Sequence, residues 1–148
     1  VARLALVGLA DQPGIAFKIF SLLAKRGINV DIILQSIGRN NTKDISFTVN
    51  KSDMDAAKSV LEEHKDSINF DHIDVNDNVA KVSIVGAGMI NNPGVAALMF
   101  EALFNAGINI NMISTSEIKV SVLVDINDAD RAVQAIHDRF FTEFGDGK

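Results

Sequence analysis

The sequence predicts an α+β protein, an α/β sandwich of two tandem units in which helices cover one face of a mostly antiparallel sheet. The first observation behind this is a repeat, since Val1–Gly8 returns as Val79–Gly86 and the Pro-Gly pair at 13–14 returns at 93–94. The second is that period-two segments alternate with helical-period segments in the same order in both copies. The repeat divides the 148 residues into a first domain, residues 1–77, and a second, residues 78–148.

In the first unit, alternating apolar residues predict a strand over 3–7, and helical spacing predicts a helix from Ile15 up to Gly27. Two further strands, over 30–37 and 45–49, flank a polar hairpin loop. A capping-box pattern at Ser52-x-x-Asp55 predicts the start of a second helix, and a last strand is predicted over 68–75. This order is that of the ferredoxin-like βαββαβ arrangement.

The second unit repeats the order but lacks its last strand. Strands are predicted over 82–85, 110–116 and 118–126, with a helix from Val95 to Gly107 and a final helix capped by Asn127 or Asp128. The residues after that helix are too few and too polar for a sixth element. Because a bare sheet edge promotes aggregation, we expect a neighbouring strand, from preceding sequence or from a partner chain, to cover it.

Composition excludes several classes of protein. Hydrophobic residues make up 47% of the chain and are spread evenly, which excludes disorder. No apolar run approaches the roughly 20 residues needed to cross a membrane. With a formal net charge of −5 and no cluster of Lys and Arg, nucleic-acid binding is not expected. The chain has no cysteine and no signal-peptide pattern, so we expect it in the reducing cytoplasm.

The sequence predicts no catalytic residues, no metal site and no cofactor in this chain. The histidines (His64, His72 and His137) lack ligand spacing, and neither a nucleophile elbow nor a phosphate-binding loop is present. The Gly86-Ala-Gly88 segment begins like a dinucleotide fingerprint, but Asn91 stands where the third glycine belongs. An enzyme of the acylphosphatase type would share the topology but needs an Arg in the first strand–helix loop, and residues 9–14 contain none.

The two Pro-Gly loops are the best candidates for a binding site. Each directly precedes a helix, whose unpaired N–H groups and dipole favour a carboxylate. Asp11 and the Asn-containing starts of the second strands, Asn29–Asp31 and Asn109–Asn111, are expected close by and can receive an ammonium group. Gln35 lies further along one of these strands, and Ser116-Glu117 ends the other. These residues predict either a sensor of a zwitterionic small molecule or, if the loops are only fold punctuation, an oligomerisation module.

Several segments closely resemble the regulatory region of aspartokinase, which is two tandem ACT domains and is also made separately as a β subunit in some bacteria. The segments that carry the resemblance are Asp11-Gln-Pro-Gly14, Gly27-Ile-Asn-Val-Asp31, Gln35-Ser36, Thr42-Lys-Asp-Ile-Ser-Phe-Thr48, Val82-Ser-Ile-Val-Gly-Ala-Gly-Met89, Asn92-Pro-Gly-Val95 and Ile113-Ser-Thr-Ser-Glu-Ile118. The resemblance covers essentially the whole chain, and the Val-Gly-Ala-Gly-Met and Ile-Ser-Thr-Ser-Glu-Ile segments are specific to that family.

The resemblance implies a feedback sensor of threonine, lysine or both, in the pathway to lysine, threonine and methionine. The family phosphorylates aspartate with ATP and Mg in a catalytic domain that is absent here, and its effectors bind where the first ACT domain of one chain meets the second of another. The implied partners are therefore an amino-acid effector, a second copy of the chain and a catalytic aspartokinase subunit. By matching position, the implied effector contacts are Asp11, Pro13, Gly14, Ile15, Ala16, Asn29, Val30, Asp31 and Gln35 in the first domain, and Val95, Ala96, Asn109, Ile110, Ser116 and Glu117 in the second.

Two departures from the family bear on these expectations. The family often has Lys where Gln12 stands, which changes the charge beside the first loop. Family members also carry a short strand before the position of Val1 that completes the second ACT sheet. Its absence, together with a first residue other than Met, leads us to expect a chain shortened at its start or preceded by a disordered leader.

Overall fold

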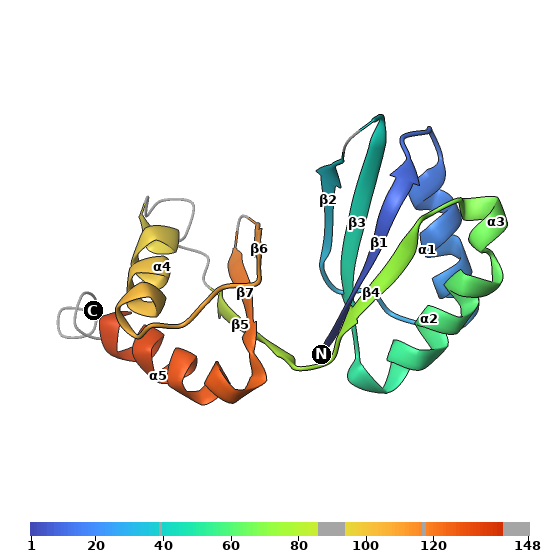
Figure 1. The fold of residues 1–148 in the computed structure, drawn as a ribbon. Helices are drawn as coiled ribbons and strands as arrows, with labels where there is room; N and C mark the ends of the chain where they lie inside the picture. The colour runs from blue at the N-terminus through green and yellow to red at the C-terminus, as the bar shows by residue number, and fades with distance from the viewer. Residues whose placement is uncertain (39, 86–93, 117, 141–148) are drawn as a thin grey trace. The chain divides into compact units, whose positions relative to one another are not determined.

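The chain forms two compact units, Val1–Asp77 and Asn78–Lys148, each built from one sheet and its own helices (Figure 1). The computed structural model describes residues 1–38, 40–85, 94–116 and 118–140. Each unit is described below by itself. Both follow the ferredoxin-like strand and helix order, so the predicted α+β class is confirmed.

Unit 1 is a four-stranded antiparallel sheet in the order β2-β3-β1-β4, with its helices on one face (Figure 1). This order follows from the split βαβ arrangement, in which a helix carries the chain over a neighbouring strand. The elements are β1 (Ala2–Ala10), α1 (Ile15–Lys25), β2 (Ile33–Ile37), β3 (Thr42–Val49), a 3₁₀ turn (Lys51–Asp53), α2 (Met54–Glu63), α3 (Lys65–Ile68) and β4 (His72–Asn76).

The core of unit 1 lies between the two central strands and α1 and α2. Leu4 pairs with Phe47 across β1 and β3, and Leu6 pairs with Ile45, so that four apolar side chains face the helices. The ring of Phe47 packs edge-on against Phe20 of α1, with 5.6 Å between the ring centroids. From the helices, the most deeply buried apolar side chains are Ile19, Leu23, Ala57, Val60, Leu61 and Ile68.

In unit 2 the described residues form a three-stranded antiparallel sheet in the order β5-β7-β6, again with helices on one face. Its helix-side core combines alternate residues of β5 and β7, among them Val82, Val120, Val122 and Val124, with Met99 and Leu103. The elements are β5 (Val79–Val85), α4 (Val95–Asn105), β6 (Met112–Thr115), β7 (Lys119–Asp125), a 3₁₀ turn (Ile126–Asp128) and α5 (Ala129–Phe140).

The second strand of unit 1 is shorter than predicted, because β2 begins at Ile33 rather than at Val30. The preceding residues still bond to β3: the Asp31 N–H donates to the Thr48 carbonyl, and the Thr48 N–H donates to the Ile32 carbonyl. The hydroxyl of Thr48 also accepts the Ile32 N–H at 3.0 Å. The Thr48 side chain therefore substitutes for part of the regular ladder, and the strand begins later than predicted.

The predicted cap of the second helix of unit 1 is wrong. Ser52 lies inside the 3₁₀ turn that precedes α2, and no side chain caps either this turn or α2. In unit 2 a 3₁₀ turn also precedes the last helix, and the carboxylate of Asp125 caps this turn by accepting the Asn127 N–H at 2.9 Å. The helix α5 then begins at Ala129, directly after Asp128.

The last strand of unit 1 was predicted over 68–75 but spans His72–Asn76. Ile68 ends the short helix α3, and Asn69 follows it with a left-handed φ of 65°. Ile68 and Phe70 are both buried, but they reach the core from a helix end and a loop rather than from a strand. The alternation that predicts one strand over 68–75 therefore combines a helix end and a loop with the residues Ile73 and Val75 of β4.

Replacing Phe47 by Ala should destabilise unit 1 by roughly 3–5 kcal/mol, because it leaves a cavity beneath α1 and removes the contact with Phe20. Phe17 on α1 is 78% exposed, so Phe17→Ala is the matched control and should cost less than about 0.5 kcal/mol. Urea unfolding followed by circular dichroism measures both. Equal losses of stability would contradict the assignment of Phe47 to the core.

Candidate functional site

The loop between β1 and α1 leads directly into a helix start that no side chain caps. Gly14 occupies the position before α1 with φ 85°, and Gly94 occupies the same position before α4 with φ 97°. For both helices, the structure describes no side-chain hydrogen bond at this cap. Because the first N–H groups of a helix have no partner within it, each start can bind an anion such as a carboxylate.

Two residues near the start of β3 hold Asp11 in this loop. The Asp11 N–H donates to the Asn41 carbonyl at 3.0 Å. The Lys43 ammonium lies 3.4 Å from Asp11 Oδ1. The Asp11 side chain is 63% exposed and that of Lys43 only 12%. An acidic group is thus held at the surface by a cation whose side chain is mostly buried.

A β-bulge in β1 is held in place by Asp44 of β3. The register between β1 and β3 shifts between Leu6 and Leu9, and Gly8 lies in the shift with φ 77°. Its N–H donates to Asp44 Oδ1 at 3.0 Å. Bulges redirect the following residues, so Asp44 helps to aim the loop that contains Asp11.

No sequence pattern had singled out Asn41, Lys43 or Asp44 as site residues. A signal for Lys43 was present, since it occupies an inward position in the alternation that continues with Ile45 and Phe47. A charged residue in such a position is rarely buried unless it is paired. Its partner, however, becomes visible only with the register of β1 and β3.

The predicted contact residues of unit 1 fall into two groups at opposite ends of α1. Asp11, Pro13 and Gly14 are exposed at its start, where Ile15 is buried in the core and Ala16 is partly buried. Asn29, Val30 and Asp31 follow its end. A helix of 11 residues is about 16 Å long. The expectation that both groups lie close together within one unit is therefore wrong.

Unit 2 shows the same separation. Val95 and Ala96 begin α4, whereas Asn109 and Ile110 follow its end. Ser116 lies in the β6–β7 turn, where its N–H donates to the Lys119 carbonyl at 2.7 Å, and Glu117 lies outside the described residues. Gln35 is exposed on β2 of unit 1, opposite Ile45. Each unit thus presents a helix-start group and a strand-start group that do not meet.

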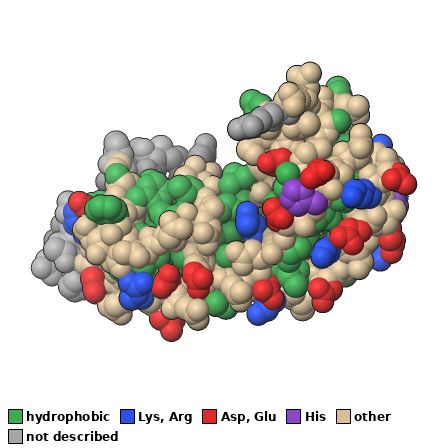
Figure 2. Space-filling view, in the orientation of Figure 1, with side chains coloured by type: hydrophobic (Ala, Val, Ile, Leu, Met, Phe, Trp, Pro, Cys, Tyr) green, Lys and Arg blue, Asp and Glu red, His purple; other side chains and the backbone are tan. Residues whose placement is uncertain are grey.

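The charged side chains of both signs are interspersed on the face shown in Figure 2. Among the described residues, no group of three His, Asp or Glu is arranged to hold a metal ion. None of the helices in the described ranges is long and apolar enough to cross a membrane.

His72, the first residue of β4, lies between the carboxylates of Asp71 and Asp74. His72 Nδ1 lies 2.7 Å from Asp71 Oδ2, and His72 Nε2 lies 3.4 Å from Asp74 Oδ1. The hydrogen bond to Asp71 raises the pKa of His72 above its ordinary value, and the charge of Asp74 acts in the same direction. Asp71 also lies against the bulge, where its N–H donates to the Val7 carbonyl.

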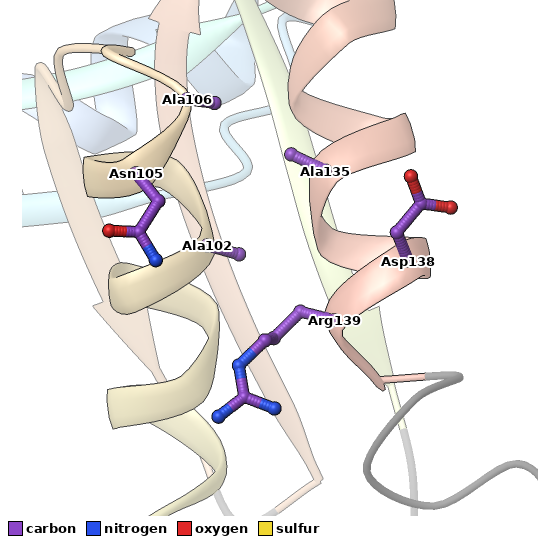
Figure 3. A pocket seen from close by; sticks show the side chains of 6 residues that line it. All are labelled: Ala102, Asn105, Ala106, Ala135, Asp138 and Arg139. Atoms are coloured by element: carbon purple, nitrogen blue, oxygen red, sulfur yellow. The ribbon is translucent and has the colours of Figure 1, made fainter.

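A shallow groove lies between α4 and α5 in unit 2 (Figure 3). Its lining residues are Ala102, Asn105, Ala106, Ala135, Asp138 and Arg139. Arg139 is engaged by Glu101, with 2.9 Å between Nη2 and Oε1. The groove lies along the C-terminal half of α4, away from the helix start, and offers mainly alanine methyl groups.

Comparison with known proteins defines the class of this fold and site. The family model of the ACT domain matches residues 4–64 and 82–140, one copy in each unit. Aspartokinase 2 of Bacillus subtilis (strain 168) is 49% identical over 140 residues, which are 95% of this chain and 34% of that protein. The chain thus spans about a third of the length of the curated relatives it matches.

Solved structures give the same result. The ligand-free regulatory subunit of aspartate kinase from Thermus thermophilus is 41% identical with a TM-score of 0.87, over 94% of this chain and 91% of that one. A structure of aspartokinase alpha and beta subunits is 46% identical with a TM-score of 0.87, over the same shares. The chain therefore belongs to the regulatory, tandem ACT-domain part of the aspartate kinase family.

Gly8, in the bulge of β1, and Gly14, directly before α1, should differ in their tolerance of replacement by Ala. Both have left-handed φ angles, which cost a non-glycine residue roughly 1–2 kcal/mol. A Cβ at Gly14 meets nothing within 4 Å, whereas one at Gly8 would lie 2.9 Å from the Asp71 Cβ. Gly8→Ala should therefore destabilise unit 1 by about 1–3 kcal/mol more than Gly14→Ala, as measured by thermal unfolding. Equal effects would contradict the close packing at the bulge.

Replacing Asp71 by Asn should return the pKa of His72 towards its ordinary value of 6.5, because the principal hydrogen bond to the charged ring is weakened. Nuclear magnetic resonance titration of the ring protons measures this, with Asp55→Asn on α2 as the control. A raised pKa stabilises the fold below the unfolded value, and this contribution disappears as the pH rises through the folded value. An unchanged pKa in Asp71→Asn would contradict this account.

Proposed function

We propose that the chain senses an amino acid and feeds that signal to an aspartate kinase. The effector is threonine, lysine or both, in feedback inhibition of the pathway to lysine, threonine and methionine. The site lies where the first ACT domain of one copy meets the second ACT domain of another. The partners are a second copy of this chain and a catalytic aspartokinase part, which uses ATP and Mg in the cytoplasm.

The observation that carries this proposal is the separation of the contact groups within each unit. Asp11 to Gly14 can bind both charged groups of an amino acid, but Asn29 to Asp31 lie about a helix length away. One small ligand therefore reaches a helix-start group and a strand-start group only if these come from different units. This geometry supports a composite site in which unit 1 supplies one group and unit 2 the other.

The relatives support the choice of ligand and partner. Escherichia coli aspartokinase III, which is 25% identical with a TM-score of 0.70, has been solved in complex with lysine and aspartate. Alpha and beta subunits occur together in another related structure. An effector at a shared interface regulates by binding one quaternary state better than another.

A second candidate is an oligomerisation module that binds no ligand. This reading is favoured by apolar side chains along the outer edge of the sheet of unit 1, where Ile33 is 50% exposed and Ile37 is 94% exposed. In unit 2, Ile113 on the equivalent strand is also exposed. Edge strands of this kind promote pairing with another chain, with or without an amino acid between the chains.

Calorimetric titration with threonine, then lysine, then each in the presence of the other, tests the proposal while oligomer size is followed by light scattering. We expect saturable binding of at least one of them and a change in oligomer size or stability on binding. Asp11→Ala should weaken that binding about tenfold, the scale of one lost charge-assisted hydrogen bond. Asp55→Ala, an exposed acid on α2, is the control. A stable dimer that binds neither amino acid would favour the oligomerisation module.

A further inference from the structure

The Lys43–Asp11 ion pair of unit 1 lies at the loop that enters α1. Lys43 pairs with Leu9 of β1 on one side and with Ile37 of β2 on the other, so its backbone lies between two strands. It follows the inward alternation of Ile45 and Phe47, on the face covered by the helices. Its ammonium emerges at Asp11, in the loop that enters α1.

The charges at this place complement an amino-acid head group. Asp11 directs Oδ1 towards Lys43 at 3.4 Å, and its side chain is 63% exposed, so the carboxylate has acceptor positions left for an ammonium. Lys43 has three donors, and the uncapped start of α1 adds N–H groups a few residues away. A zwitterion carries both complementary charges, and it can insert between two side chains that satisfy each other in its absence.

We propose that Lys43 is a further effector-binding residue, whose ammonium binds the α-carboxylate of the amino acid while Asp11 binds its α-ammonium. This inference rests on the proposed function and names the part of unit 1 that recognises the head group. The start of α1 shares the carboxylate with Lys43. Recognition by Lys43 and Asp11 depends on the two charges of the head group and not on the side chain of the ligand.

In unit 2, the described residue at the position of Lys43 carries no charge. Gln35 pairs with Ile45 in unit 1, and Thr115 pairs with Val120 in unit 2, so Ile45 and Val120 are equivalent. Two residues earlier on each chain segment, Lys43 is therefore equivalent to Ile118. Ile118 is 54% exposed and carries no charge. The proposal therefore applies to unit 1 alone.

An ion pair with a purely structural role would make a different prediction. If Lys43 only attaches the loop to β3, its removal loosens Asp11 and weakens the binding of every ligand that contacts the loop. If Lys43 binds the carboxylate, its removal weakens only ligands that have a carboxylate. A cycle that varies both the protein and the ligand separates these two roles.

The experiment measures the affinity of the full chain for threonine, for lysine and for their carboxamides. The carboxamides keep the ammonium but lack the carboxylate. Nuclear magnetic resonance titration reaches millimolar affinities and so includes the weaker carboxamides. The variants are Lys43→Met, which keeps the stem without the charge, Lys43→Arg, which keeps the charge, and Lys58→Met on α2 as a matched control. Circular dichroism checks that each is folded.

For the amino acid that binds wild type, we expect Lys43→Met to weaken binding by about tenfold, or about 1.4 kcal/mol. Binding of the corresponding carboxamide should weaken by less than about twofold. Lys43→Arg should stay within about threefold of wild type, and Lys58→Met should not differ from it. Equal weakening of acid and carboxamide, or no weakening of the acid, overturns the role of Lys43 and leaves the proposed function intact. If wild type binds neither amino acid, both the proposed function and this inference fail.

Discussion

The antiparallel pairing of β1 with β3 is the constraint on which the rest of unit 1 depends. Its register places Leu4 and Leu6 opposite Phe47 and Ile45, so the same four residues define the helix-covered face. A slip of one residue would turn all of them to the opposite face and leave α1 and α2 without a surface to cover. The pairing of β5 with β7 has the same role in unit 2, where Val82 meets Val122.

The same register also builds the loop before α1. Beyond the bulge at Gly8, Leu9 lies opposite Lys43, and the next residues of β1 lead into Asp11. The segment at the start of β3 thus contacts Asp11 through the Asn41 carbonyl and the Lys43 ammonium, and it contacts the bulge in β1 through the Asp44 carboxylate. An isolated surface ion pair contributes little to stability. Here its value is positional, because the Lys43 ammonium and the Asn41 carbonyl together hold an exposed acid before a helix start.

The sequence predicted the elements whose pattern is local. Period-two alternation found β1 and β3, and helical spacing found α1 and α4, because each signal lies within one segment. It failed where helix, loop and strand residues share one core, as when Ile68 and Phe70 imitated the alternation of a strand. It also failed at the start of α2, where a 3₁₀ turn contains Ser52 and no side chain caps the helix.

For the candidate site, the sequence found the two loops but not the partner of Asp11. The loops are marked by Pro, Gly and Asn, whose backbone preferences are local. Lys43 is 32 positions away, and only the strand register brings it to the loop. The sequence also placed Asn29 beside Asp11, although the length of α1 separates them. Strand register is a property of the folded chain and does not appear in a list of motifs. The separation of Asn29 from Asp11, in contrast, already follows from the length of the helix predicted from Ile15 to Gly27.

The two units differ in ways that matter for a sensor built from a repeat. Unit 1 has a charged pair at its helix start, and unit 2 has Ile118 at the position of Lys43. If each ligand contacts a helix start from one unit and a strand start from the other, the two resulting sites share the same pair of units. Filling one site then biases the arrangement that the other needs, and by thermodynamic linkage this coupling is reciprocal. Under the proposed function, divergence at this single strand position would make the two sites differ in affinity while both act through one interface.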